Sequence, residues 1–160
     1  MSESKIGVIS DTHGLLRPEA IAALQGVELI LHAGDIGKPQ ILDALNAVAP
    51  VIAVRGNNDK GSLSDQIAET QLVTVGNVSI FMIHDLKGIT VDAVRARYDI
   101  VISGHSHKAA YQTRDGVLFF NPGSAGPRRF RLPVTLGIIR LTGGKPQAEI
   151  IDLFPDNGAQ

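Results

Sequence analysis

The run Lys5-Ile6-Gly7-Val8-Ile9-Ser10 is rich in β-branched residues and ends at Asp11, the pattern of a short strand followed by a polar side chain. Residues 28–32 and 51–54 repeat this pattern and also stop at polar, glycine-containing sequence. Between these runs, residues 18–24 and 39–48 show alanine-rich helical spacing and begin at prolines, which a first helical turn tolerates. The first third of the chain therefore predicts a βαβαβ unit with a parallel sheet and right-handed crossovers.

The rest of the chain is dominated by strand patterns, and only residues 90–97 suggest one more short helix. The predicted strands are 72–75 with 78–83, 99–102, 109–113 with 116–120 across Arg114-Asp115, and 134–141 with 148–153 around Gly143-Gly144. So many strands favour an α/β fold with two mixed sheets packed face to face and helices outside. We expect a single domain over residues 1–160, with the end frayed from residue 155.

The composition excludes several classes of protein. With 160 residues, 44% apolar and 19% charged, the chain can bury one sizeable core. A net charge of -1 and 4% aromatic residues argue against an extended nucleic-acid surface. The absence of cysteine excludes disulfide frameworks, and no run is long enough for a bilayer span or shaped like a secretion signal. We expect a cytoplasmic protein without a membrane partner, in which exposed edge strands allow a homo-oligomer.

Side chains able to bind a metal follow the predicted strands, at the edge where α/β folds place their ligand sites. They occur in five segments. These are Asp11-Thr12-His13, Gly34-Asp35, Gly56-Asn57-Asn58-Asp59, His84-Asp85 and Gly104-His105-Ser106-His107. Four of the five histidines lie in these segments, so their order along a βαβ frame favours one shared metal site.

Each segment alone also allows a simpler role. Asp35 could cap the helix that begins near residue 39, and Asn57 and Asn58 could be turn residues. His84 could be a core histidine bonded to backbone. His32, the one histidine outside the five segments, is expected to be a hydrogen-bonded structural residue.

The five segments together resemble the calcineurin-like metallophosphoesterase superfamily, over about residues 6–128. The small size and the turn Asn121-Pro122-Gly123-Ser124 are similar to compact bacterial and archaeal phosphodiesterases, whose relatives include a retromer subunit. The resemblance implies a four-layer αββα sandwich that holds two divalent metal ions.

The resemblance also implies which residues hold the ions. One ion is assigned to Asp11, His13 and His107, the other to Asn57, His84 and His105, with Asp35 bridging both and Asp59 orienting a ligand or nearby backbone. As catalytic residues it implies Asp35, Asn57, Asp59 and His105.

The chemistry of this ligand set agrees with phosphate binding. Two divalent ions with two carboxylates keep about two positive charges, which attracts phosphate, and they can supply hydroxide at neutral pH. Nitrogen and oxygen ligands suit manganese, which we expect first, or iron, nickel, cobalt or zinc.

Two positions depart from the superfamily pattern. Asn58 stands where protein phosphatases carry a histidine that protonates the leaving group, so we expect a preference for activated esters. Many small relatives have His-Gly-His in the fourth segment, where this chain has His84-Asp85-Leu86 and so lacks the second histidine, and we expect Asp85 to cap nearby backbone.

Several cations flank the predicted site. Arg128 matches a position that is often basic in relatives, and it either binds a phosphate oxygen or belongs, with Arg129 and Arg131, to a solvated loop or subunit contact. Arg55 and Lys108 could steer anions.

The leading interpretation is a binuclear phosphodiesterase that acts on small phosphodiesters through metal-activated hydroxide. The alternative is a non-catalytic protein-interaction scaffold on the same fold, as the retromer relative shows. A closed structural zinc site is weaker, because such sites offer four ligands and this set offers seven.

Overall fold

Ten strands form two five-stranded sheets in the computed structural model, which describes residues 3–88 and 97–155. The first sheet has the order β10-β9-β1-β2-β3. Its strands are β1 (Glu3–Ile9), β2 (Leu29–His32), β3 (Val51–Ala53), β9 (Thr135–Thr142) and β10 (Lys145–Asp152). β1, β2 and β3 are parallel and are connected by α1 (Pro18–Ala23) and α2 (Pro39–Asn46), which confirms the predicted βαβαβ unit.

The second sheet has the order β4-β5-β6-β8-β7. Its strands are β4 (Thr70–Val75), β5 (Val78–Ile83), β6 (Ile100–Ile102), β7 (Ala110–Arg114) and β8 (Val117–Asn121). β5, β6 and β8 run parallel, while β4 and β7 pair antiparallel at the two edges. Both sheets are therefore mixed, as predicted.

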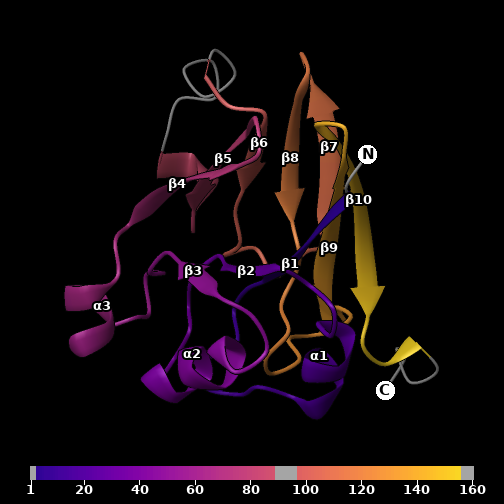
Figure 1. The fold of residues 1–160 in the computed structure, drawn as a ribbon. Helices are drawn as coiled ribbons and strands as arrows, with labels where there is room; N and C mark the ends of the chain where they lie inside the picture. Colours follow the sequence, from indigo (N-terminus) through magenta and orange to yellow (C-terminus); the bar gives the residue numbers. More distant parts are fainter. Residues whose placement is uncertain (1–2, 89–96, 156–160) are drawn as a thin grey trace.

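The two sheets pack face to face through an aliphatic core. Val8 and Leu31 of the first sheet, and Ile80 and Ile102 of the second, belong to one buried cluster between them. A second cluster lies between the first sheet and helices α1 and α2, so alternate residues of β1 face opposite layers. In Figure 1, β1–β3 lie between these helices and β4–β6. This arrangement is an α/β sandwich of two mixed sheets, and the predicted fold class is confirmed.

The outer face of the second sheet carries a smaller cluster. Val101, Val117 and Phe119 are buried there, with Leu86 and Tyr98 packed against them. Leu86 belongs to the short 3-10 helix η1 (Leu86–Gly88), which the strand patterns did not predict. No helix in the described part of the chain is long and apolar enough to cross a membrane.

The parallel strands bring their carboxyl ends together. Asp11, Asp35 and Gly56 lie just after the ends of β1, β2 and β3, and His84 and Gly104 lie just after the ends of β5 and β6. Backbone bonds join neighbouring ends within each sheet, from Asp11 N to the Gly34 carbonyl and from Gly104 N to the His84 carbonyl, both at 2.9 Å. All five predicted segments therefore meet at one edge of the sandwich.

Several strand boundaries differ from the prediction by one to three residues. The β7–β8 turn lies at Asp115-Gly116, one residue later than expected, because both residues adopt positive φ (51° and 82°) as a type I′ turn requires. β10 begins at Lys145, three residues earlier than expected, and includes Pro146, which is tolerated because β10 is an edge strand.

Two other helical predictions have different outcomes. The short helix α3 (Ser62–Gln66) was not predicted, because five residues are too few for a clear 3.6-residue period. The helix predicted for residues 90–97 falls almost wholly outside the described residues.

Gly137 of β9 is predicted to be essential for the contact between the sheets. A Cβ at this position would overlap the ring of Phe120, which crosses from the second sheet. Gly137→Ala should therefore lower the free energy of unfolding by about 1–3 kcal/mol through overpacking. Urea unfolding of wild type, Gly137→Ala, Phe120→Leu and the double variant measures the coupling, and we expect Gly137→Ala to cost less when the Phe120→Leu change is also present. Additive losses would contradict this origin.

Candidate metal centre

Asp11 follows β1 and is fully buried, and its two carboxylate oxygens have different surroundings. Oδ2 accepts hydrogen bonds from Ser10 Oγ at 2.7 Å and from the backbone N–H of His105 at 3.1 Å. Oδ1 has no hydrogen-bond partner among the described residues. One oxygen is thus held in place while the other is available to a cation.

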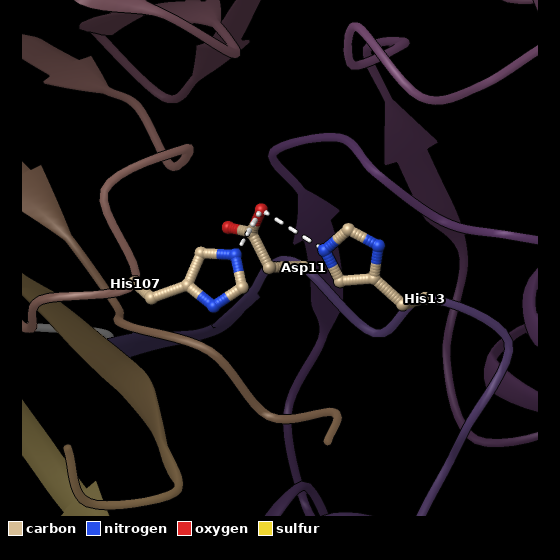
Figure 2. A group of neighbouring side chains, drawn as sticks. All are labelled: Asp11, His13 and His107. Atoms are coloured by element: carbon tan, nitrogen blue, oxygen red, sulfur yellow. Dashed lines mark ion pairs between the residues drawn. The ribbon is translucent and has the colours of Figure 1, made fainter. Parts of the chain in front are cut away.

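Three imidazoles point at this available oxygen. His107 Nε2 lies 3.3 Å from Asp11 Oδ1, and the Nε2 atoms of His13 and His84 each lie 3.8 Å from it. Figure 2 shows His13 and His107 on opposite sides of the carboxylate with their ring nitrogens turned toward it. Asp11, His13 and His107 offer ligand atoms within 4.8 Å of one another, as one metal ion requires.

Asp35, which follows β2, forms a second group around the same centre. Its Oδ2 lies 3.3 Å from His84 Nε2 and 3.6 Å from His13 Nε2. Ligand atoms of Asp11, Asp35 and His84 also fall within 4.8 Å of one another. Because Asp11 belongs to both groups and His13 reaches both carboxylates, the two groups are neighbours.

The tautomer of His84 follows from its other nitrogen. Nδ1 lies 2.7 Å from the Ala33 carbonyl, which can only accept, so Nδ1 carries the hydrogen and donates it. In the neutral ring, Nε2 then presents its lone pair toward the two carboxylates, which is the form that binds a metal. In this one conformation His84 is bonded to the backbone through Nδ1 and available as a metal ligand through Nε2, so the two predicted roles are compatible.

Asn58 holds Asp35 through both carboxylate oxygens. Its backbone N–H donates to Oδ1 at 2.9 Å, and its side-chain amide donates to Oδ2 at 3.0 Å. Gly56 allows this close approach, since a Cβ there would overlap the Asp35 carboxylate. The helix-capping alternative for Asp35 is wrong, because α2 begins after Lys38 without a side-chain cap.

Asn57 and His105 lie at the rim. The His105 side chain is 42% exposed, its ring centroid lies 5.2 Å from that of His84, and its Nε2 lies 3.7 Å from Asp85 Oδ2. Asn57 is exposed and lines a hollow of about 340 Å³ together with His84 and Asp85. Five of the seven predicted ligands thus converge, and these two border the cluster. Asp85 also accepts from the backbone N–H of Lys87, the capping bond expected of it.

The backbone is strained where the predicted ligands stand. Among the described residues, seven non-glycine residues have positive φ, and five of them are predicted ligands. These are Asp11, His13, Asp35, His105 and His107, with φ between 45° and 72°. Such conformations cost about 1–3 kcal/mol each and persist where a site needs them. Their concentration here marks the edge as functional.

The protonation equilibria reflect burial opposed by mutual attraction. Burial raises the pKa of Asp11, although the Ser10 hydroxyl partly opposes this shift. For Asp35 burial acts in the same direction, but the neighbouring His84 imidazole and the hydrogen bonds from Asn58 outweigh it, so its pKa is lowered. Burial lowers the pKa of His107, whereas in His84 the nearby Asp35 and Asp11 carboxylates and the Ala33 carbonyl outweigh burial and the pKa is raised. Protons bound to this cluster therefore offset part of the cost of burying its charged groups, and they would compete with a metal ion for the same ligand atoms.

The donor set fits a divalent cation. Within the described residues, the buried side-chain atoms without a hydrogen-bond partner are Asp11 Oδ1, His13 Nε2, His84 Nε2 and His107 Nδ1. The first three of these atoms face one another. Buried polar atoms normally have partners, and a cation between them would satisfy all three. Oxygen and imidazole nitrogen without sulfur suit a first-row transition metal.

A second set of side chains supports the strand ends. Asp59 accepts from the backbone N–H groups of Gly56 at 2.8 Å and Gly37 at 3.0 Å, which fixes the loop that carries Asn58. The Asn121 amide donates to the Gly104 carbonyl, and Ser124 Oγ donates to the Asp11 carbonyl, both at 3.0 Å. The residue pattern places the Asn121–Ser124 turn near this edge but does not predict these bonds, nor those of Asn58, because a side-chain partner distant in sequence leaves no pattern.

His32 is the structural residue expected from the sequence. It is fully buried, and its Nδ1 accepts from the Gly34 N–H at 3.1 Å. Nε2 therefore carries the hydrogen and donates to Thr12 Oγ1 at 3.0 Å, and the Thr12 hydroxyl donates to the Ile36 carbonyl. Burial lowers the pKa of His32 to about 4, so the ring is neutral at physiological pH.

The flanking arginines have different surroundings. Arg55 donates to the Ile67 carbonyl at 3.1 Å and lies 3.7 Å from Glu69. Arg128 donates to the Leu132 carbonyl within its own loop at 3.2 Å. The charge of Arg129 is close enough to His107 to lower its pKa. Arg129 thus contributes positive charge near the candidate metal centre.

Comparison with known proteins agrees with this geometry. Residues 5–144 match the model of the calcineurin-like phosphoesterase superfamily domain. A probable metallophosphoesterase of Methanothermobacter thermautotrophicus is 37% identical, covering 91% of each chain. A phosphodiesterase of Methanocaldococcus jannaschii is 31% identical, over 92% of this chain and 98% of the relative. The structure of Vacuolar Protein Sorting 29 from Cryptosporidium parvum superposes with a TM-score of 0.74 at 19% identity, over 94% and 97% of the two chains.

Neutral His32 predicts a specific loss of stability in acid. In the unfolded chain His32 binds a proton near pH 6.5, whereas in the folded chain it does so only near pH 4. The free energy of unfolding therefore falls as the pH falls through the window from 6.5 to about 4. The penalty is absent above the window and amounts to about 2 kcal/mol at pH 5. Urea unfolding of the metal-free protein near pH 7.5 and pH 5 should show a larger loss for wild type than for His32→Gln. Equal losses would contradict the assignment.

Proposed function

The chain belongs to the calcineurin-like phosphoesterase superfamily, and we propose that it is a binuclear metal-dependent phosphodiesterase acting on small phosphodiesters. The observation that carries the proposal is the convergence of three imidazole nitrogens on Asp11 Oδ1, with Asp35 beside them. The similarity to a relative named as a phosphodiesterase supports diesters as the substrate class.

The proposed ligand assignment takes the first group of the metal centre for one ion and combines His84 and Asp35 of the second group with Asn57 and His105 from the rim for the other. Asp11, His13 and His107 would hold one ion. Asn57, His84 and His105 would hold the other, and Asp35 would bridge both. The close approach of Asp35 Oδ2 to both His13 and His84 supports a bridging role, because these two histidines are assigned to different ions.

When bound, two divalent ions would supply a water of lowered pKa as the nucleophile and positive charge for the phosphoryl oxygens. In the reaction, water adds to phosphorus, one ester oxygen leaves with its alcohol, and a phosphomonoester remains. The chain contributes the fixed geometry: Asn58 keeps Asp35 in place, and the Ala33 carbonyl accepts the Nδ1 hydrogen of His84, so that Nε2 faces the carboxylates. Manganese is the ion we propose first, with iron, nickel, cobalt or zinc as alternatives.

The alternative function is a non-catalytic interaction scaffold on the same fold. The similarity to Vacuolar Protein Sorting 29 is consistent with it, although at 19% identity this likeness concerns the fold alone. A scaffold would not need five strained, buried or clustered ligand residues, whose polar atoms are costly to bury without a cation. We therefore favour the enzyme.

Removal of the bridging carboxylate is predicted to abolish both metal binding and hydrolysis. Wild type should bind about two divalent ions per chain by elemental analysis and hydrolyse bis-p-nitrophenyl phosphate with added manganese. Asp35→Asn should lose metal and at least about a hundredfold in kcat/KM, and His105→Ala should also lose activity.

Asp43→Asn, an exposed change on α2, is the matched control and should keep both properties. Circular dichroism verifies that each variant is folded. Turnover that survives both Asp35→Asn and His105→Ala would reveal a contaminating enzyme, and two bound metals without turnover on any ester would favour the scaffold.

The leaving group is predicted to control the rate strongly. Asn58 is neutral and its amide is engaged with Asp35, so it supplies no proton to the departing oxygen. General acid catalysis is typically worth 10²–10⁴-fold. Methyl phenyl phosphate should therefore react at least about a hundredfold more slowly than methyl p-nitrophenyl phosphate. Similar rates for the two esters would show that another group donates the proton.

A further inference from the structure

A groove opens directly beside His105, on the outer face of the second sheet. Its volume is about 690 Å³, and its lining includes Asp85, Leu86 and Lys87 on one side and residues of β7 and β8 on the other. The loop 103–106 that carries His105 forms one end. The groove is therefore continuous with the metal centre.

The register of the β7–β8 hairpin gives the groove its length. Ala110 pairs with Asn121, Gln112 with Phe119, and Arg114 with Val117, so these pairs share one face of the sheet. Asn121 stands at the metal end, where its amide bonds the Gly104 carbonyl. Ala110 and Arg114 are four residue steps apart along β7, a distance of about 13 Å at roughly 3.3 Å per residue. A group the size of a nucleoside fits this length.

The floor of the groove is aromatic and its rim is cationic. Phe119 is 7% exposed within the outer cluster, and the guanidinium of Arg114 lies 5.1 Å from its ring centroid. Three exposed cations, Lys87, Lys108 and Arg114, line the groove.

Among the residues that the structure describes, Asp85 is the one carboxylate of this lining, and its oxygens already contact the Lys87 N–H and His105. The groove is therefore complementary to an aromatic group that carries negative charge. The hollow on the other side of His84 differs, because its cation, Arg55, is engaged with Ile67 and Glu69.

We propose that this groove binds one ester arm of the substrate, and that this arm is aromatic and carries a second anionic group, as a phosphorylated nucleoside does. The inference rests on the proposed phosphodiesterase function, since it places the diester at the metals and its arm beside His105. Phe119 provides an apolar surface for the ring, and Arg114 provides a charge for the distal anion.

The test compares three diesters that release the same p-nitrophenolate. Their other arms are methyl, thymidine, and thymidine with a 3′-phosphate. Wild type should show a kcat/KM about tenfold or more higher for the phosphorylated thymidine ester than for the methyl ester, with the uncharged thymidine ester between them.

Two variants probe the groove and one serves as control. Arg114→Ala should lower kcat/KM for the phosphorylated ester about three- to tenfold more than for the thymidine ester. Ala110→Trp, which fills the groove, should lower both thymidine esters more than the methyl ester. Lys145→Ala removes an exposed cation of β10 in the other sheet and should change none of the three.

A second readout does not depend on turnover. In the metal-free protein, thymidine 3′,5′-bisphosphate should shift the amide resonances of Ala110, Gln112 and Phe119, and these shifts should weaken in Arg114→Ala. Shifts confined to other parts of the protein would overturn the inference.

The outcomes separate the two proposals. Equal hydrolysis of all three esters, unaffected by Arg114→Ala and Ala110→Trp, would overturn the groove assignment and leave the phosphodiesterase proposal intact. Absence of hydrolysis of every ester by the metal-loaded protein would overturn the proposed function, and the substrate assignment of the groove with it.

Discussion

The structure depends on the burial of two carboxylates, Asp11 and Asp35, among imidazoles at the junction of two sheets. Burial of a charged group is costly unless it is paired and hydrogen-bonded. Here each carboxylate has fixed donors, Ser10 and the His105 N–H for Asp11, and Asn58 for Asp35. Asp11 Oδ1, which these donors leave without a partner, faces the Nε2 atoms of His13 and His84, which also have none. The cost of burying these polar atoms is therefore concentrated at a place where a bound cation can offset it.

The sandwich architecture makes this concentration possible. Parallel strands in each sheet place their carboxyl ends at one edge, and the face-to-face packing brings the two edges together. The loops must then turn sharply, which explains why Asp11, Asp35 and His107 accept positive φ. An aliphatic core between the sheets supplies the stability that tolerates such strain.

The same arrangement divides the surroundings of the centre into two sides. The first sheet contributes Asp11, Asp35 and the neutral His32 beneath them, all deeply buried. The second sheet contributes the buried His84 and His107, and also His105 and Asp85, which are partly exposed and border the cationic groove along β7 and β8. In our proposal, metal binding thus depends on the buried residues of both sheets, and substrate selection lies on the open side of the second sheet.

Much of this protein was determined by its sequence alone. Strand-length β-branched runs and helical alanine spacing are local signals, so the βαβαβ unit and all three hairpins could be predicted. Polar residues after successive strands located the metal centre, because parallel topology brings strand ends together. The local patterns predicted strand boundaries least well where the position of a strand at the sheet edge or the geometry of a turn decides the boundary, as at Pro146 and Asp115-Gly116.

Only the tertiary structure decided how the side chains are coupled. The bonds of Asn58 to Asp35 and of Asn121 to the Gly104 carbonyl join residues far apart in the chain, and hydrogen-bond partners of this kind leave no periodic trace in a sequence. The groove beside His105 likewise exists only when η1 lies opposite the β7–β8 hairpin. Residue types suffice to identify possible ligands, whereas distances and burial require the packed fold.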